Sequence, residues 1–98
     1  MLVGSWRTVL VVEVPGDLQT WTTTWSFGAD GSCHQRVVTE SLAEGFPRVT
    51  DRDCTFIAQD FEIVISYVGG GTVEFDYSFA DFLPDRLIFG GFEYERVA

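Results

Sequence analysis

The sequence predicts an all-β fold, an eight-stranded antiparallel up-and-down β-barrel formed as a single domain by residues 1–98. Three observations favour this fold. β-branched and aromatic residues dominate without helical periodicity, and Gly, Pro and Asp interrupt the chain about every ten residues. The 98 residues, 46% of them hydrophobic and 15% aromatic, have the size and composition of one folded domain.

Eight segments between these interruptions have the length and residue types of strands. They are Leu2–Val14, Gln19–Phe27, Ser32–Glu40, Arg48–Ala58, Phe61–Val68, Thr72–Phe79, Arg86–Phe89 and Phe92–Val97. We expect each to pair with the next because most links between them are short. Only Ser41–Pro47 and Ala80–Asp85 are longer, with room for a lid or a short helical turn.

Turn residues join the neighbouring strands. Pro-Gly-Asp at 15–17 is a turn signal, and Ala-Asp-Gly at 29–31 suits a type I turn closed by a left-handed glycine. Gln-Asp at 59–60, Gly-Gly-Gly at 69–71 and Gly-Gly at 90–91 suit tight hairpins. Each turn therefore also predicts which residues lie opposite each other in the two strands that it connects.

The turns predict four directly opposed pairs: Trp25 with Gln35, Phe56 with Ile63, Ile65 with Phe75, and Leu87 with Tyr94. Across the longer link at 41–47, pairing Cys33 with Cys54 places His34 opposite Asp53 and Arg36 opposite Asp51. The opposed charges of Arg36 and Asp51 support the register independently, because such pairs stabilise neighbouring strands.

In this register thirteen of the fifteen aromatic side chains share one face of the sheet. They are Trp6, Trp21, Trp25, Phe27, Phe56, Phe61, Tyr67, Phe75, Tyr77, Phe79, Phe89, Phe92 and Tyr94. Phe46 and Phe82 fall in the two longer links. A sheet with one apolar face hides it most simply by closing into a barrel, which also removes both edges. A two-sheet β-sandwich is the alternative, because hairpin registers do not distinguish closure from stacking.

Both ends of the chain carry residues that resemble the lipocalin and wider calycin pattern. Gly4-Ser5-Trp6 opens the first strand, and Arg96 lies in the last strand on the inward side beside Tyr94. The aromatic hairpin at 25–32 also resembles small bacterial lipocalin-like domains. The resemblance implies that Arg96 stacks on Trp6 and hydrogen-bonds to nearby main chain, closing one end of the barrel. Typical lipocalins are longer, so a barrel with shorter walls is expected.

Inward-facing polar groups suggest a pocket for a small hydrophobic or amphiphilic molecule. Gln35, Thr39 and Arg52 cluster on the third and fourth strands, opposite a mainly aromatic wall. The predicted lining is Trp21, Trp25, Gln35, Arg52, Phe56, Ile65, Tyr67, Phe75, Tyr77 and Tyr94. An interior filled by these side chains is the alternative, since eight strands leave room for side chains or for one small ligand.

The predicted interior offers little for catalysis. It contains no pair of carboxylates for acid and base chemistry, and the single histidine, His34, faces outward beside Asp53. We therefore assign no catalytic residue, no metal ligand and no cofactor. Lipocalin-like cyclases and isomerases make an enzyme of that type, acting on a hydrophobic substrate with phenols, Gln35 and Arg52, an alternative to simple binding.

Cys33 and Cys54 are predicted to be neighbours on adjacent strands, where a disulfide is possible. Two buried thiols are favoured over a disulfide because we expect a cytoplasmic protein. No secretory signal pattern is recognised in residues 1–14.

Charge and surface composition indicate the class of partner. The formal net charge is −9, from fifteen acidic and six basic residues, so phosphate backbones and anionic membranes are repelled. We therefore expect no nucleic-acid or membrane partner. Outward-facing aliphatic residues form a patch that a homodimer could cover, which makes a dimerisation or interaction module the third functional alternative. They are Val9, Val11, Val38, Ile57, Val64 and Ile88.

Overall fold

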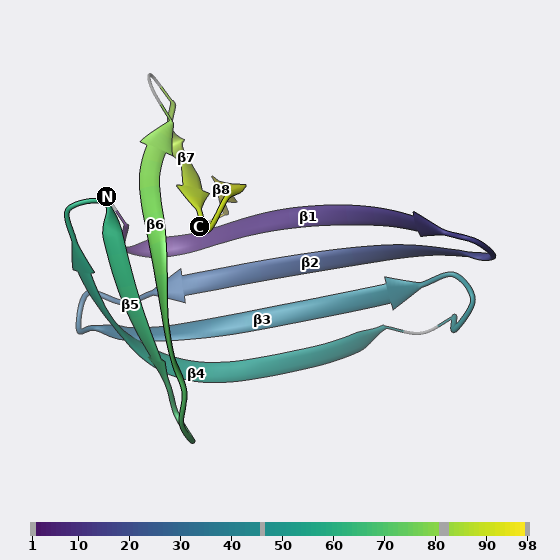
Figure 1. Cartoon of the computed structure of the whole chain (residues 1–98), viewed down its shortest axis with the longest axis horizontal. Helices are drawn as coiled ribbons and strands as arrows, with labels where there is room; N and C mark the ends of the chain where they lie inside the picture. The colour runs from purple at the N-terminus through teal and green to yellow at the C-terminus, as the bar shows by residue number, and fades with distance from the viewer. Residues whose placement is uncertain (1, 46, 81–82, 98) are drawn as a thin grey trace.

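The computed structural model describes residues 2–45, 47–80 and 83–97, with side chains for all of these except 80 and 83–85. Within them eight antiparallel strands form a closed barrel in which each strand pairs with the next, so the predicted fold is confirmed (Figure 1). The strands are β1 (Gly4–Val14), β2 (Asp17–Phe27), β3 (Ser32–Ser41), β4 (Arg48–Gln59), β5 (Glu62–Tyr67), β6 (Thr72–Ala80), β7 (Leu83–Phe89) and β8 (Phe92–Arg96). Among the described residues, no helix has the length and apolar character needed to span a membrane.

The barrel is closed over only part of its length. Strands β1 to β4 are 10 to 12 residues long, whereas β5 has 6 residues and β8 has 5. β8 pairs with β1 only at Trp6 and Arg7, and β5 pairs with β4 only from Cys54 onward. The remaining part of β1 to β4 projects beyond the closed barrel as a four-stranded sheet (Figure 1). We call this sheet the extension; it comprises Thr8–Val14, Asp17–Thr23, Val37–Ser41 and Arg48–Thr50.

Most predicted registers are confirmed, including Trp25 opposite Gln35, and Leu87 opposite Tyr94. The registers of β5 against β4 and β6 are each wrong by two residues: Phe56 pairs with Ile65, and Ile63 pairs with Phe75. The β4–β5 turn lies at Asp60 and Phe61, one residue later than predicted, with φ of +64° at Phe61. A bulky L-residue rarely adopts this conformation, so composition alone does not indicate the turn. A shift of two residues leaves every side chain on its predicted face.

The core lies in the closed part of the barrel. Trp6, Ile63, Ile65 and Leu87 are less than 2% exposed, and other aromatic side chains surround them. Three aromatic residues predicted for the inner lining are exposed instead: Phe61 by 72%, Phe92 by 51% and Trp21 by 42%. Phe61 lies in a hairpin turn and Phe92 directly follows one, while Trp21 lies on the extension. Phe46 and Phe82 lie outside the described residues.

One end of the barrel is closed by Trp6 and Arg96. The indole nitrogen of Trp6 donates to the carbonyl of Leu2 at 2.8 Å, and the guanidinium carbon of Arg96 lies 4.2 Å from the centroid of the Trp6 ring. Arg96 also donates to the carbonyl of Val3 at 3.1 Å. Gly4, with φ of +136°, lets the chain enter β1 in a conformation that favours glycine. The structure thus brings together the three residues of the lipocalin resemblance.

Cys33 and Cys54 form a disulfide, whereas the sequence favoured two thiols. They lie directly opposite each other on β3 and β4, with Cα atoms 4.8 Å apart and both side chains buried. This separation lies within the range that a disulfide requires.

Candidate functional site

The residues predicted to line a cavity fall into different environments. Trp25, Ile65 and Tyr94 are buried in the core, and Phe56, Tyr67, Phe75 and Tyr77 pack against that core partly buried. The rings of Phe75 and Phe89 have centroids 4.7 Å apart, and those of Phe27 and Phe56 are 5.0 Å apart. Side chains therefore occupy the described interior. The remaining candidates, Trp21, Gln35 and Arg52, lie where β1 to β4 continue beyond the closed part of the barrel, and we call this region the open end.

Arg52, Tyr67 and Gln35 form a polar cluster at this open end. The guanidinium carbon of Arg52 lies 3.6 Å from the centroid of the Tyr67 ring, and the Tyr67 hydroxyl donates to Oε1 of Gln35 at 3.4 Å. The cluster follows from register, since Gln35 and Arg52 are directly opposed and Tyr67 lies on the next strand. Burial raises the pKa of Tyr67, partly offset by the charge of Arg52, so Tyr67 is a neutral donor near pH 7.

Arg52 differs from several other arginines of the chain in its surroundings. Arg48 pairs with Glu44 at 3.0 Å, and Arg86 pairs with Glu95 at 3.4 Å. Arg52 makes no ion pair with any carboxylate that the structure describes, although the chain carries a net charge of −9. Stacking on Tyr67 holds its guanidinium in place and leaves an exposed cation that an anionic group can approach.

Next to this cluster lies one side of the extension, formed by the side chains that point to the same face of the sheet as the buried Trp6 and Trp25. We call it the inner face; it carries Thr8, Leu10, Val12, Gln19, Trp21, Thr23, Val37, Thr39, Ser41, Arg48 and Thr50. Leu10 is 44% exposed and Trp21 is 42% exposed, so two large apolar side chains face solvent close together on paired strands. Leu10 and Val37 were missing from the predicted lining, although their phase along the strands could have identified them.

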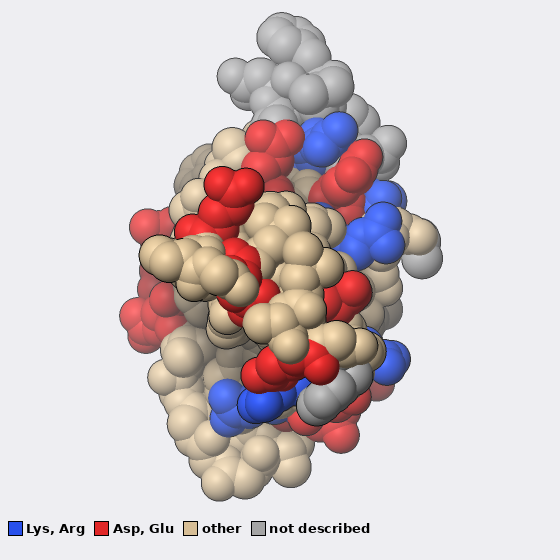
Figure 2. All heavy atoms as spheres, turned by 90° about the vertical axis from the view of Figure 1, so that its right-hand side faces the viewer, with Lys and Arg blue, Asp and Glu red and all other residues tan. Residues whose placement is uncertain are grey.

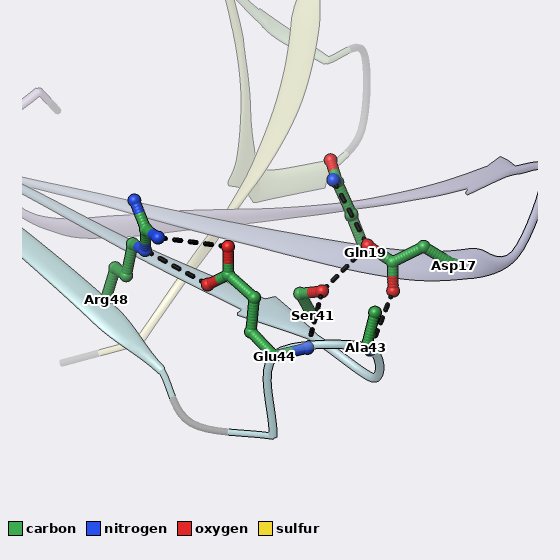
Figure 3. Close-up of polar contacts among 6 residues, drawn as sticks. All are labelled: Asp17, Gln19, Ser41, Ala43, Glu44 and Arg48. Carbon is green, nitrogen blue, oxygen red and sulfur yellow. Dashed lines mark hydrogen bonds and ion pairs between the residues drawn. The ribbon is translucent and has the colours of Figure 1, made fainter.

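The far end of the extension is held by Asp17 (Figure 3). Its carboxylate accepts hydrogen bonds from the hydroxyl of Ser41 at 2.7 Å and from the amide of Ala43 at 3.0 Å. These bonds, the one from Ser41 first, lower the pKa of Asp17. Glu44 and Arg48 form a two-bond ion pair in the same loop region, with both distances 3.0 Å. Figure 2, which views this end, shows acidic and basic side chains interspersed with uncharged ones.

His34 lies on the outer surface between two carboxylates. Its Nδ1 lies 2.8 Å from Oδ1 of Asp53, and its Nε2 lies 2.8 Å from Oδ1 of Asp51. The hydrogen bond to Asp53, followed by that to Asp51, raises the pKa of His34. Ionised carboxylates only accept hydrogen bonds, so both bonds form when both ring nitrogens carry protons. In this state neither ring nitrogen has a free lone pair. His34 therefore cannot act as a general base toward the hydroxyl of Ser26, which lies opposite it on β2.

The surface also has open hollows outside the barrel interior. One of about 470 Å³ lies near the closed end and includes Gly4, Ser26, His34 and Cys54. Among the described side chains, no group of three acidic, His or Cys residues is arranged to hold a metal ion. Neither feature adds a reactive group to the polar cluster around Arg52.

Comparisons of the chain with protein-family models, with curated proteins and with solved structures each find no match. The eight-stranded antiparallel barrel is compatible with a lipocalin-like fold.

Proposed function

We propose that this chain is a lipocalin-like protein that binds a small amphiphilic molecule with a carboxylate or similar anionic end. The bound molecule lies at the open end of the barrel, with its charged end at Arg52 and its apolar part on the inner face of the extension. The observation that carries this proposal is the exposed Arg52 guanidinium, stacked on Tyr67 and without an ion pair to any described carboxylate.

The polar cluster supplies the recognition of the charged end. A guanidinium binds a carboxylate through two parallel N–H donors, and a fixed guanidinium loses less side-chain entropy on binding than a free one. Gln35 accepts a hydrogen bond from the Tyr67 hydroxyl through its carbonyl oxygen, and its side-chain NH2 group is a further donor next to Arg52. A neutral analogue would make fewer of these bonds and is expected to bind less tightly.

The inner face supplies the apolar contact. Leu10 and Trp21 are directly paired on β1 and β2, and both are more than 40% exposed. Between them and the Arg52 cluster lies a cross-strand row of small side chains, Thr8, Thr23, Val37 and Thr50. An alkyl chain lying across this row would cover apolar surface at about 25 cal/mol per Å² removed from water.

Titration with dodecanoate and dodecanol, followed by Trp fluorescence, tests the proposal. The wild type should bind dodecanoate more tightly than dodecanol. Arg52→Gln should weaken dodecanoate binding by about tenfold, the size expected for a lost charged hydrogen bond, and should leave dodecanol binding unchanged. Arg36→Gln is the matched control, because Arg36 is exposed on the outer surface near Asp51. Equal binding of the two compounds by the wild type, or equal effects of the two variants, would reject the proposal.

The cyclase or isomerase alternative requires Tyr67, Tyr77, Gln35 and Arg52 to act on one substrate. The Tyr77 hydroxyl instead donates to the main-chain carbonyl of Gln59 at 2.8 Å. No observation on the described residues favours this alternative over binding.

A further inference from the structure

The outer edge of β1 in the extension has no neighbouring strand. β2 pairs with β1 along its whole length on one side, but β8 pairs on the other side only at Trp6 and Arg7. No described residue pairs with Thr8–Val14 on that side, and Figure 1 shows this part of β1 running along the margin of the sheet. The main-chain groups of this segment that point away from β2 therefore lack a strand partner within the described chain.

The identity of these groups follows from the hydrogen bonds at the start of β1. The amide of Val97 donates to the carbonyl of Ser5 at 2.9 Å, so Ser5 directs its main-chain groups away from β2. Main-chain direction alternates along a strand, so Val9, Val11 and Glu13 direct theirs to the same side. These three residues form a regular row of donors and acceptors along the edge.

The two edges of the extension differ sharply in side-chain character. The unpaired edge of β4 runs from Arg48 to Arg52, two residues beyond the extension, and carries three charged residues in five, a composition that discourages pairing between molecules. The β1 edge, Thr8–Val14, carries Glu13 as its one charged residue among five Val and Leu residues. Val9 and Val11 are 56% and 58% exposed. An edge of this kind is a template for pairing with another strand, whereas the β4 edge is protected against it.

We propose that the β1 edge pairs antiparallel with the β1 edge of a second copy of this chain, about a two-fold axis at Val11. Val11 is the midpoint of the free segment, so this register uses all of it. Val11 then faces Val11 of the second copy, and Val9 faces Glu13. The two four-stranded extensions become one continuous sheet, in which the main-chain groups of Val9, Val11 and Glu13 are hydrogen-bonded.

Charge complementarity supports a second copy as the partner. Arg7 and Glu13 both lie on the outer side of β1, and neither forms an ion pair with a described side chain. In the proposed register Glu13 of one copy lies directly opposite Val9 of the other copy. Arg7 of that other copy is two residues from Val9 on the same face, so it is the diagonal neighbour of Glu13. Diagonal neighbours at this spacing are within reach of long side chains. The symmetric arrangement places this pair at both ends of the new ladder.

Sedimentation velocity over a range of concentrations tests this pairing. The wild type should be a dimer at the higher concentrations, and Val11→Glu should raise its dissociation constant by at least about tenfold, because like charges would face each other at the axis. Val49→Glu is the matched control: Val49 is 48% exposed on the outer side of the extension, but lies at the β4 edge. Circular dichroism checks that both variants fold.

Cysteine cross-linking tests the register. Val11→Cys should form a covalent dimer on mild oxidation, because the two introduced thiols face each other across the axis, whereas Val49→Cys should not. A wild type that stays monomeric throughout the concentration range would overturn the proposal. So would dissociation by Val49→Glu as strong as by Val11→Glu, since the interface would then be the outer face rather than the edge.

Discussion

At the scale of single residues, His34 joins two carboxylates of the neighbouring strand on the outer surface. It bridges Asp51 and Asp53, which are two residues apart on β4 and therefore share its outer side. The bridge depends on protonation of the imidazole, and the pKa of His34 in the folded chain is raised above its ordinary value of 6.5.

This bridge predicts a pH dependence of stability. A pKa raised on folding means that the contribution is fully present below about pH 6.5 and is lost as the pH rises through the folded-state pKa. The wild type should therefore exceed His34→Gln in free energy of unfolding at pH 5.5, and the difference should shrink as the pH rises above neutrality. Urea unfolding at a series of pH values measures it. A difference that grows with pH would contradict the assignment.

A second residue-scale prediction compares two isoleucines on neighbouring strands. Ile63 on β5 is completely buried, whereas Ile57 on β4 is 67% exposed. Ile63→Ala should lower the free energy of unfolding by about 2 to 5 kcal/mol, because it removes buried methyl groups and leaves a cavity. Ile57→Ala should change it by less than about 0.5 kcal/mol. Equal effects in chemical denaturation would contradict the burial of Ile63 in the core.

At the scale of elements, the β4–β5 hairpin contains a conformation that its residue does not favour. Phe61 has φ of +64°, is 72% exposed, and its carbonyl accepts the amide of Tyr77 at 3.0 Å. The hydrogen bond to β6 helps hold this turn, so tertiary pairing overrides the local preference. This explains why the register of β5 could not be predicted from turn composition.

Phe61→Gly should therefore stabilise the protein by about 1 kcal/mol, because a left-handed L-residue costs about 1 to 2 kcal/mol and glycine removes most of this strain. Phe92→Gly is the control: Phe92 is 51% exposed and its φ is not positive, so this change should destabilise. Thermal and urea unfolding of both variants provide the comparison. Destabilisation by Phe61→Gly would mean that contacts of its ring outweigh the strain.

At the scale of the whole molecule, closure of the barrel depends on a short contact between the first and last strands. The described β1–β8 pairing consists of Trp6 with Arg96 and Arg7 with Glu95, and the amide of Val97 adds a bond to Ser5. Arg96 covers Trp6 and also bonds the carbonyl of Val3. One side chain therefore joins the two ends of the sheet.

Arg96→Ala should lower the free energy of unfolding by about 1 to 3 kcal/mol, from the lost cation–π contact and the carbonyl left without its donor. Hydrogen exchange of the Val97 amide should accelerate, because that amide bonds across the same seam. Arg86→Ala is the control, since Arg86 forms surface ion pairs with Glu93 and Glu95 that contribute little. Unchanged exchange at Val97 would count against closure by Arg96.

The candidate site was predictable only in part, for a physical reason. Gln35 and Arg52 could be placed opposite each other by pairing Cys33 with Cys54, a register that the opposed charges of Arg36 and Asp51 support. The stacking of Arg52 on Tyr67 could not be predicted, because the predicted register of β5 was displaced by two residues. Nor does periodicity reveal that Trp25 is buried and Trp21 exposed, because both have the same phase on β2.

The sequence by itself determined the strand order, most of the turns and the face of the sheet on which most of the described strand side chains lie. These properties depend on residue alternation and on local turn chemistry, both of which are written in neighbouring residues. Only the tertiary structure decided where the barrel is closed, which aromatic residues it buries, and that Cys33 and Cys54 are joined. Closure depends on how far the last strands extend along the first ones, and this overlap is set by contacts between residues distant in the chain.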